Sequence, residues 1–228
     1  TLCFNYRYRR RIGSSSEGLA LSIGALTERL QHPEVSLIGH SQGGLVARRA
    51  VVAGRGRDGS MPARLKLRLV TVSSPFNGIG SSSHCGIAAF HILSLGVATA
   101  ICQGIAGSIW PEIHPRSDFV TEPGELLETV SDHLMIVTDE RESCRRRSAE
   151  GRCLTDDFVF SVKEQRNELL TRDSRVTDFE IRQGHAAIVG DENLPPLQLM
   201  TILKESGIMN RTPPGRHAEV QALLSRLY

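Results

Sequence analysis

The sequence predicts an α/β fold with a mostly parallel sheet and helices on both faces. Apolar runs at 35–38, 67–72 and 134–138 have the length and composition of buried strands, and segments with helical spacing of apolar residues lie between them. Strands that alternate with helices favour a parallel sheet, because each crossover lays a helix against one face. A chain of 228 residues suits one domain with a full core.

Two further strands and four helices complete the expected pattern. The additional strands are 2–6 and 176–183. The first helix is expected from a capping-box sequence at Ser14–Glu17 to about residue 31. A second helix should run from Leu45 through Ala53, a third should cover 195–208, and an amphipathic one should end at Tyr228.

The stretch from Val35 to Arg48 contains the pattern G-x-S-x-G, with Ser41 at its centre. A strand, a sharp turn and a helix form the context in which this pattern exposes a nucleophilic serine. Gly39, Gly43 and Gly44 leave room for the strand and helix to approach each other. The positive end of the helix would then stabilise an oxyanion that develops at the serine. The alternative is a glycine-rich turn with an incidental serine.

This stretch resembles the nucleophile elbow of α/β-hydrolase-fold lipases and esterases. The resemblance continues in family order through 69–76, 157–161 and Gly184–His185, so it covers most of residues 1–190. It implies an α/β-hydrolase fold and a serine hydrolase that cleaves carboxylic esters of lipids or small molecules through a Ser-His-Asp triad and an acyl-enzyme. No cofactor and no metal are expected.

The chain also departs from that family at its beginning. Lipases of this fold have an earlier strand that ends in a His-Gly turn, and the turn supplies one oxyanion-hole N–H. No His-Gly dipeptide occurs in this chain. We therefore expect a single domain over 1–228 that is N-terminally incomplete, with the backbone N–H of Gln42 as one oxyanion donor and the second donor outside the chain.

Activation of Ser41 requires a base and an orienting carboxylate. His185 follows the last expected strand and satisfies the order serine, acid, histidine. Two aspartates compete for the acid. Asp157 opens a segment that resembles the D-G-V-V-S-x-x-S-Q signature of many lipases, with Phe158 in place of glycine, and it is preferred over Asp139 at the end of strand 134–138. Asp156 is a third candidate, more in keeping with a solvated loop.

The five cysteines bear on the compartment. A Cys144–Cys153 disulfide and a Cys85–Cys102 disulfide, with Cys3 as a buried thiol, would favour an exported or otherwise oxidising location. The alternative is five unrelated reduced thiols. No spacing suggests zinc. The net charge of +2 is too balanced to indicate nucleic acid as a partner, and the sequence does not predict an oligomeric state.

Residues 69–111 contain no charged side chain, and 86–110 are apolar. A membrane span there would separate Ser41 from the acid and base, so an apolar cap or lid within an insertion at 77–128 is preferred, with a buried helix pair as the alternative. Such a cap would suit contact with a lipid interface. Two other functions remain open: an acyltransferase on the same fold, and a non-catalytic binding module.

Overall fold

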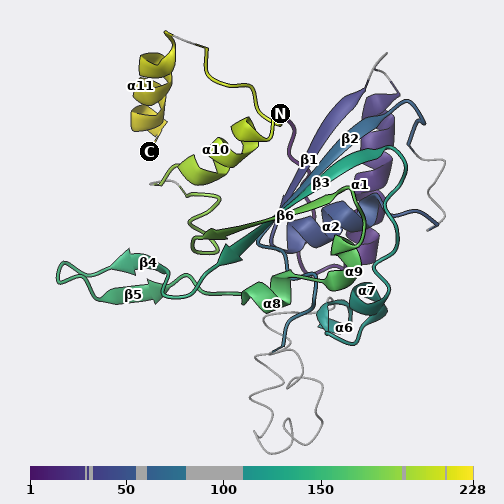
Figure 1. Cartoon of the computed structure of the whole chain (residues 1–228), viewed down its shortest axis with the longest axis horizontal. Helices are drawn as coiled ribbons and strands as arrows, with labels where there is room; N and C mark the ends of the chain where they lie inside the picture. The colour runs from purple at the N-terminus through teal and green to yellow at the C-terminus, as the bar shows by residue number, and fades with distance from the viewer. Residues whose placement is uncertain are drawn as a thin grey trace, which may run out of the picture. The chain divides into compact units, whose positions relative to one another are not determined.

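The computed structural model describes residues 1–28, 30, 33–54, 61–80, 110–191, 194–213 and 215–227. It contains a four-stranded sheet with the order β1-β2-β3-β6 (Figure 1). The strands are β1 (Glu34–His40), β2 (Lys66–Val72), β3 (Val130–Asp139) and β6 (Val176–Arg182). These strands confirm four of the five that the sequence predicts, and the fold class is confirmed with them.

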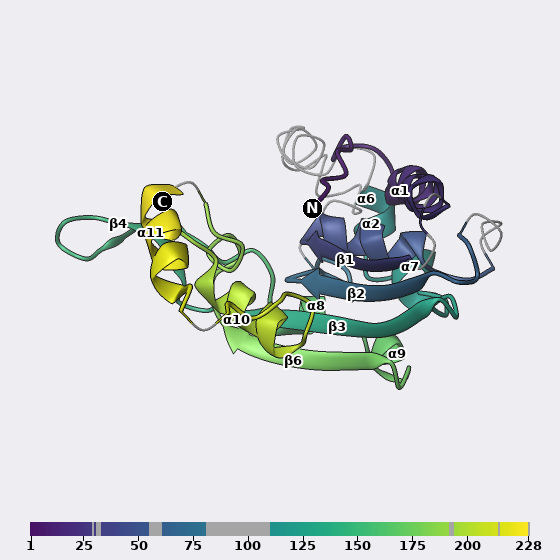
Figure 2. The same cartoon turned by 90° about the horizontal axis from the view of Figure 1, so that it is seen from above.

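All four strands run in parallel (Figure 2). β1 pairs with β2 from Glu34 opposite Lys66 to His40 opposite Val72. β2 pairs with β3 with a register shift after Leu67. Between β3 and β6, hydrogen bonds join His133 N to Arg175 O and Gln183 N to Asp139 O. The residue numbers rise on both strands from the first bond to the second, so these strands run in the same direction. The carboxyl ends of the strands therefore share one edge of the sheet.

The helices beside the first strands build the core. α2 (Gln42–Ala50) packs against β1 and β2, and α1 (Ile12–Thr27) packs against α2. Buried side chains from these elements form one cluster that includes Ile12, Leu45 and Leu69. The shorter helices are α6 (Trp110–Ile113), α7 (Asp118–Thr121), α8 (Val162–Gln165) and α9 (Glu168–Thr171).

The described chain forms two compact units. The first comprises residues 1–137 and 162–179, and the second comprises 138–161 and 180–228. The second unit contains the antiparallel hairpin of β4 (Cys144–Arg147) and β5 (Cys153–Asp156), followed by α10 (Leu197–Glu205) and α11 (His217–Leu227). The two C-terminal helices match the predicted ones.

The expected strand over residues 2–6 is wrong. These residues have no regular secondary structure and no ladder hydrogen bond within the described part of the chain. Leu2 is 76% exposed, so the apolar alternation that suggested a strand does not correspond to a buried face. Phe4 and Tyr6 instead stack on each other, with their ring centroids 6.0 Å apart. Cys3, expected to be a buried thiol, is exposed and unpaired.

The start of α1 also differs from the prediction. The helix begins at Ile12 rather than after a Ser14 cap, and Arg11 at the N-cap supplies no side-chain capping bond. The carboxylate of Glu112 accepts hydrogen bonds from Ile12 N at 2.6 Å and Gly13 N at 3.4 Å. A distant glutamate thus satisfies the N–H groups that a capping box would have served.

The expected cap falls largely outside the described residues. Residues 86–110, except Trp110 at the start of α6, and the cysteines Cys85 and Cys102 belong to that part of the sequence, so the lid and the second disulfide remain predictions. Of the 77–128 insertion, 77–80 and 110–128 are described. None of the helices in the described ranges is both long and apolar enough to cross a membrane.

Candidate active site

Ser41 lies at the turn between β1 and α2 with strained backbone angles, φ 54° and ψ −128°. Its N–H donates to Val72 O at 2.9 Å, which fixes the turn to the carboxyl end of β2. Its side chain makes no capping hydrogen bond to α2. A non-glycine residue held at positive φ costs free energy and marks a turn that its surroundings enforce.

Two glycines make this turn possible. A Cβ atom on Gly39 would lie 2.5 Å from the backbone oxygen of Gly43, and a Cβ on Gly44 would lie 2.0 Å from Ser74 Oγ. Backbone atoms cannot move aside as a flexible side-chain end can, so the strand and helix approach this closely only because residue 39 lacks a side chain. The prediction is confirmed for Gly39 and Gly44, whereas the atom nearest to a Cβ on Gly43 would be Tyr6 Oη at 3.6 Å, an ordinary contact.

Gln42 is the first residue of α2. Across the described ranges its backbone N–H has no hydrogen-bond acceptor, as expected for the first turn of a helix. Its side-chain Nε2 donates to Tyr8 O at 2.9 Å and so ties the N-terminal segment to the elbow. The amide remains available for an oxyanion beside Ser41.

In the second unit, His185 is paired with Glu140. The Nδ1 atom of His185 lies 3.0 Å from Glu140 Oε1, and the Glu140 side chain is fully buried while that of His185 is 12% exposed. The ring of Phe160 packs edge-on against the imidazole at 5.0 Å between centroids. These contacts fix the orientation of the ring and direct Nδ1 at a carboxylate.

Three further groups hold the Glu140 carboxylate. The hydroxyl of Thr138 donates to Oε1 at 2.9 Å, and the backbone N–H groups of Val159 and Phe160 donate to Oε2 at 2.6 and 2.8 Å. Hydrogen bonds to an ionised carboxylate are stronger than those between neutral groups, and they satisfy a buried charge that would otherwise be costly. Glu140 is therefore a buried carboxyl group whose orientation beside a histidine is fixed by hydrogen bonds.

Asp157, the predicted triad acid, has other partners. Its Oδ1 and Oδ2 accept from Ala186 N and Ala187 N, each at 3.0 Å, and its backbone O accepts from His185 N at 3.0 Å. A Cβ on Gly184 would lie 2.1 Å from Asp157 Oδ2, so the lack of a side chain at residue 184 leaves room for the carboxylate. Asp157 holds the loop that carries His185, and Glu140 occupies the Nδ1 side of the ring.

The other two aspartates are also engaged elsewhere. Arg141 donates to both carboxylate oxygens of Asp139, at 2.7 and 2.6 Å, and these hydrogen bonds lower the pKa of Asp139 to about 2. Asp156 is exposed and accepts from Phe158 N at 3.1 Å. Glu140 is not among the candidates that the sequence patterns indicated. The signal for it was its place directly after the strand that ends at Asp139.

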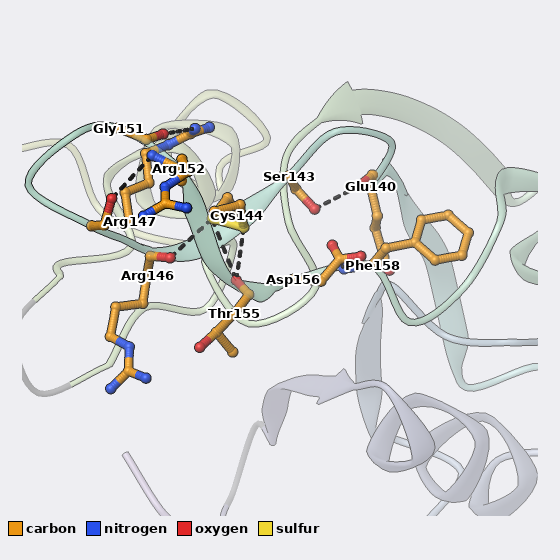
Figure 3. The surroundings of a disulfide bond; sticks show 12 residues. Glu140, Ser143, Cys144, Arg146, Arg147, Gly151, Arg152, Thr155, Asp156 and Phe158 are labelled. Atoms are coloured by element: carbon orange, nitrogen blue, oxygen red, sulfur yellow. Dashed lines mark hydrogen bonds between the residues drawn. A yellow bond between two sulfur atoms is a disulfide. The ribbon is translucent and has the colours of Figure 1, made fainter.

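The Cys144–Cys153 disulfide is present, as predicted, with Cα atoms 5.8 Å apart (Figure 3). It closes the hairpin that connects Glu140 to the Val159 and Phe160 amides. Ser143 begins this connection, and its hydroxyl donates to Glu140 O at 2.5 Å. Within the described ranges, no group of three or more His, Cys, Asp or Glu side chains is arranged to hold a metal ion.

Comparisons with known proteins agree with this architecture. Residues 16–107, which include the elbow, match the family model "Putative serine esterase (DUF676)". The structure resembles the mature lipase BlEst2 of Bacillus licheniformis at 11% identity and a TM-score of 0.54, over 89% of this chain and 76% of that one.

A putative cell surface hydrolase from Lactobacillus plantarum aligns over 93% of this chain and 68% of its own, at 14% identity and a TM-score of 0.44. No curated protein sequence matches significantly. The chain thus has the α/β-hydrolase fold, its elbow segment matches a serine-esterase family model, and together these findings support a serine hydrolase that resembles lipases and esterases.

Proposed function

We propose that this protein hydrolyses carboxylic esters with Ser41 as nucleophile, His185 as general base and Glu140 as the orienting acid. The observation that carries the proposal is the strained backbone of Ser41 between a parallel strand and a helix. Such strain concentrates at functional sites, where the surrounding structure compensates for its cost. In this fold, the strand–turn–helix is where the nucleophilic serine resides.

The order of the strands supports the same assignment. Ser41 follows β1, Glu140 follows β3, and His185 comes three residues after β6 ends at Arg182. Loops at the carboxyl ends of parallel strands gather at one edge of a sheet, where ligands bind in open α/β folds. The chain order serine, acid, histidine is also the order that α/β-hydrolases use.

The choice of Glu140 rests on its contact with His185. An orienting acid must accept the Nδ1–H of the base, so that Nε2 is free to take the serine proton. Glu140 Oε1 lies at hydrogen-bond distance from Nδ1, and donors on its other side hold this buried carboxyl group in place. In this proposal Asp157 positions the histidine loop and does not contact the reacting atoms.

The reaction then proceeds in two halves. Ser41 Oγ attacks the ester carbonyl carbon while His185 Nε2 takes the hydroxyl proton, and the oxyanion accepts from the Gln42 N–H. The tetrahedral intermediate collapses, the alcohol leaves with the proton from His185, and an acyl-enzyme forms. Water activated by His185 attacks that ester and releases the acid and free Ser41. Glu140 stabilises the imidazolium at each stage.

The substrate class follows from the family resemblance and the composition. We propose small-molecule or lipid esters, with the apolar segment 86–110 as a contact to a lipid interface. The disulfide favours an oxidising, extracytoplasmic location. No feature of the overall charge favours nucleic acid, since the net charge is only +2.

A fluorophosphonate probe tests the assignment, applied to the longest natural form of the protein. Ser41→Ala should abolish labelling and hydrolysis of a p-nitrophenyl ester, and His185→Gln should reduce both by several orders of magnitude. Ser22→Ala is the matched control, because Ser22 is an exposed serine of α1 whose hydroxyl donates to Gly18 O within its own helix. Undiminished labelling in Ser41→Ala would refute the nucleophile. A folded wild-type protein that neither labels nor hydrolyses would refute the enzyme.

A further inference from the structure

The hairpin β4–β5 concentrates positive charge. Residues 144–153 contain four arginines (Arg145, Arg146, Arg147, Arg152) and one acid, Glu150, so ten residues carry a net charge of +3 in a chain whose total is +2. All four arginines are exposed. The disulfide between Cys144 and Cys153 closes this segment and holds the arginines on a defined scaffold (Figure 3).

Neighbouring acids neutralise little of this charge. Arg145 is 3.8 Å from Asp191, a long ion pair with a half-exposed arginine side chain. Arg147 donates to a backbone oxygen, that of Gly151, at 3.2 Å. Among the described residues, no acceptor lies at the guanidinium groups of Arg146 and Arg152. In Figure 3 the Arg146 side chain extends away from the disulfide. These groups are available for an external anion.

Exposed apolar side chains adjoin the same hairpin. Leu154 on β5 is 55% exposed, and Phe158 and Val159 just beyond it are 45% and 49% exposed. Leu154 and Phe158 also line an open groove of about 630 Å³ together with Arg141, Glu142 and Asp156. Of these two acids, Glu142 is paired with Arg182. An exposed cluster of arginines with leucine, phenylalanine and valine next to it is the composition of segments that lie in a membrane interface.

We propose that the hairpin β4–β5, with Leu154, Phe158 and Val159, docks on the surface of an anionic lipid bilayer. Arginine forks bind the phosphate and carboxylate oxygens of headgroups, because a guanidinium donates two parallel hydrogen bonds. The three apolar side chains enter the boundary between headgroups and acyl chains. The phosphates of nucleic acid would bind the arginines equally well, but nucleic acid has no apolar layer into which Leu154 and Val159 could insert.

Vesicle co-sedimentation with the full-length protein tests this surface. Wild-type protein should bind phosphatidylcholine vesicles that contain phosphatidylserine more tightly than vesicles of phosphatidylcholine alone. Each basic side chain near an anionic surface changes affinity about fivefold, so Arg146→Gln with Arg152→Gln should weaken binding about 25-fold. The binding of Ser41→Ala should equal that of wild type, which makes this test independent of the proposed esterase activity.

The control removes the same charge elsewhere. Arg116 and Arg172 are exposed and belong to the other compact unit. Arg116→Gln with Arg172→Gln should change vesicle affinity about twofold at most, because neither residue belongs to the hairpin that is proposed to dock. An equal loss in both pairs would mean attraction by net charge, and the proposal would fail. Unchanged melting temperatures in both pairs verify that folding is intact.

A second variant tests the apolar part. Leu154→Ser should keep much of the binding at low salt and lose it at high salt, where the electrostatic attraction is screened. Equal binding of wild type and Leu154→Ser at every salt concentration would remove the apolar contact. The proposal is overturned if wild-type protein does not bind anionic vesicles. It is also overturned if duplex DNA binds the protein more tightly than the vesicles do and displaces them.

Discussion

Glu140 Oε1 lies 3.0 Å from His185 Nδ1, and the carboxylate is fully buried while the imidazole remains partly accessible. The two residues are 45 positions apart in sequence and are brought together by the loops after β3 and β6. This arrangement leaves one ring nitrogen, Nε2, for proton transfer and gives the other a fixed acceptor. Substitution of Glu140, Asp139 and Asp157 can therefore test which carboxylate orients the imidazole.

Replacing the acid should separate Glu140 from the aspartates. Glu140→Gln keeps the side-chain shape but removes the anion that fixes the imidazole tautomer, so kcat should fall about 10⁴-fold, the loss typical of an amide in this role. Asp139→Asn should leave kcat nearly unchanged, because the Asp139 carboxylate is bound to Arg141. Steady-state kinetics with a p-nitrophenyl ester measure both. A larger loss in Asp157→Asn than in Glu140→Gln would transfer the role to Asp157.

A methyl group at Gly39 should disrupt the elbow. The Cβ of Gly39→Ala would lie 2.5 Å from Gly43 O and 2.7 Å from Gly44 Cα. Because those are backbone atoms, the free energy of unfolding should fall by about 3 kcal/mol or more, at or above the upper end of ordinary overpacking. Gly13→Ala is the control, since the nearest atom to its Cβ is 3.6 Å away. Denaturant melts should show a neutral or stabilising effect at Gly13, and equal stability of the two variants would contradict this account.

His133 should make the protein less stable in acid. Burial, with a smaller contribution from Arg48, lowers the pKa of His133 to about 3, and its Nε2 is 2.8 Å from Thr71 Oγ1. The unfolded chain takes up a proton near the ordinary pKa of about 6.5, while the folded one does not. Stability is therefore lost as pH falls from about 6.5 toward 3, with a slope of about 1.4 kcal/mol per pH unit from this residue.

Urea melts of wild type and His133→Gln at a series of pH values measure that slope. The variant should show a shallower decline between about pH 6 and 4.5, because one titrating group has been removed. Identical slopes in the two proteins would mean that His133 is protonated in the folded state at these pH values.

Removing the disulfide should destabilise the hairpin and disturb the position of Glu140, which precedes the hairpin in the chain. Closing a loop of about 10 residues contributes about 2.7 kcal/mol on the chain-entropy model, so Cys144→Ser with Cys153→Ser should lower the melting temperature. Because the hairpin joins Glu140 to the Val159 and Phe160 amides, kcat should fall as well. Dithiothreitol should lower the melting temperature of wild type further than it lowers that of the double variant, because only wild type has the Cys144–Cys153 bond to lose. A wild type insensitive to reductant would argue against this coupling.

Local patterns predicted the elements that depend on local sequence. The apolar runs, the glycine spacing around Ser41 and the Cys144–Cys153 bracket each act within a few residues, and all of them appear in the structure. The segment 2–6 failed because alternation of apolar residues does not establish that a neighbouring strand and a buried face exist.

The proposed acid, Glu140, was harder to identify from the sequence for a physical reason. Asp139 and Glu140 are adjacent, and the end of a strand directs successive side chains to different sides. Their partners distinguish them: Arg141 binds Asp139, whereas Glu140 accepts from the Thr138 hydroxyl and from the Val159 amide, 19 positions away. The family signature at Asp157 suggested a role through likeness, whereas its carboxylate bonds to the backbone of the histidine loop.

The Glu112 carboxylate at the start of α1 has a consequence for synthesis of the chain. It comes 100 positions after Ile12, whose N–H it accepts. At about 5–20 residues per second, a ribosome needs roughly 5–20 s to add that length. Throughout that interval the nascent helix has water in place of its native cap. Its first turn can therefore reach its final state only after residues 13–112 have been made.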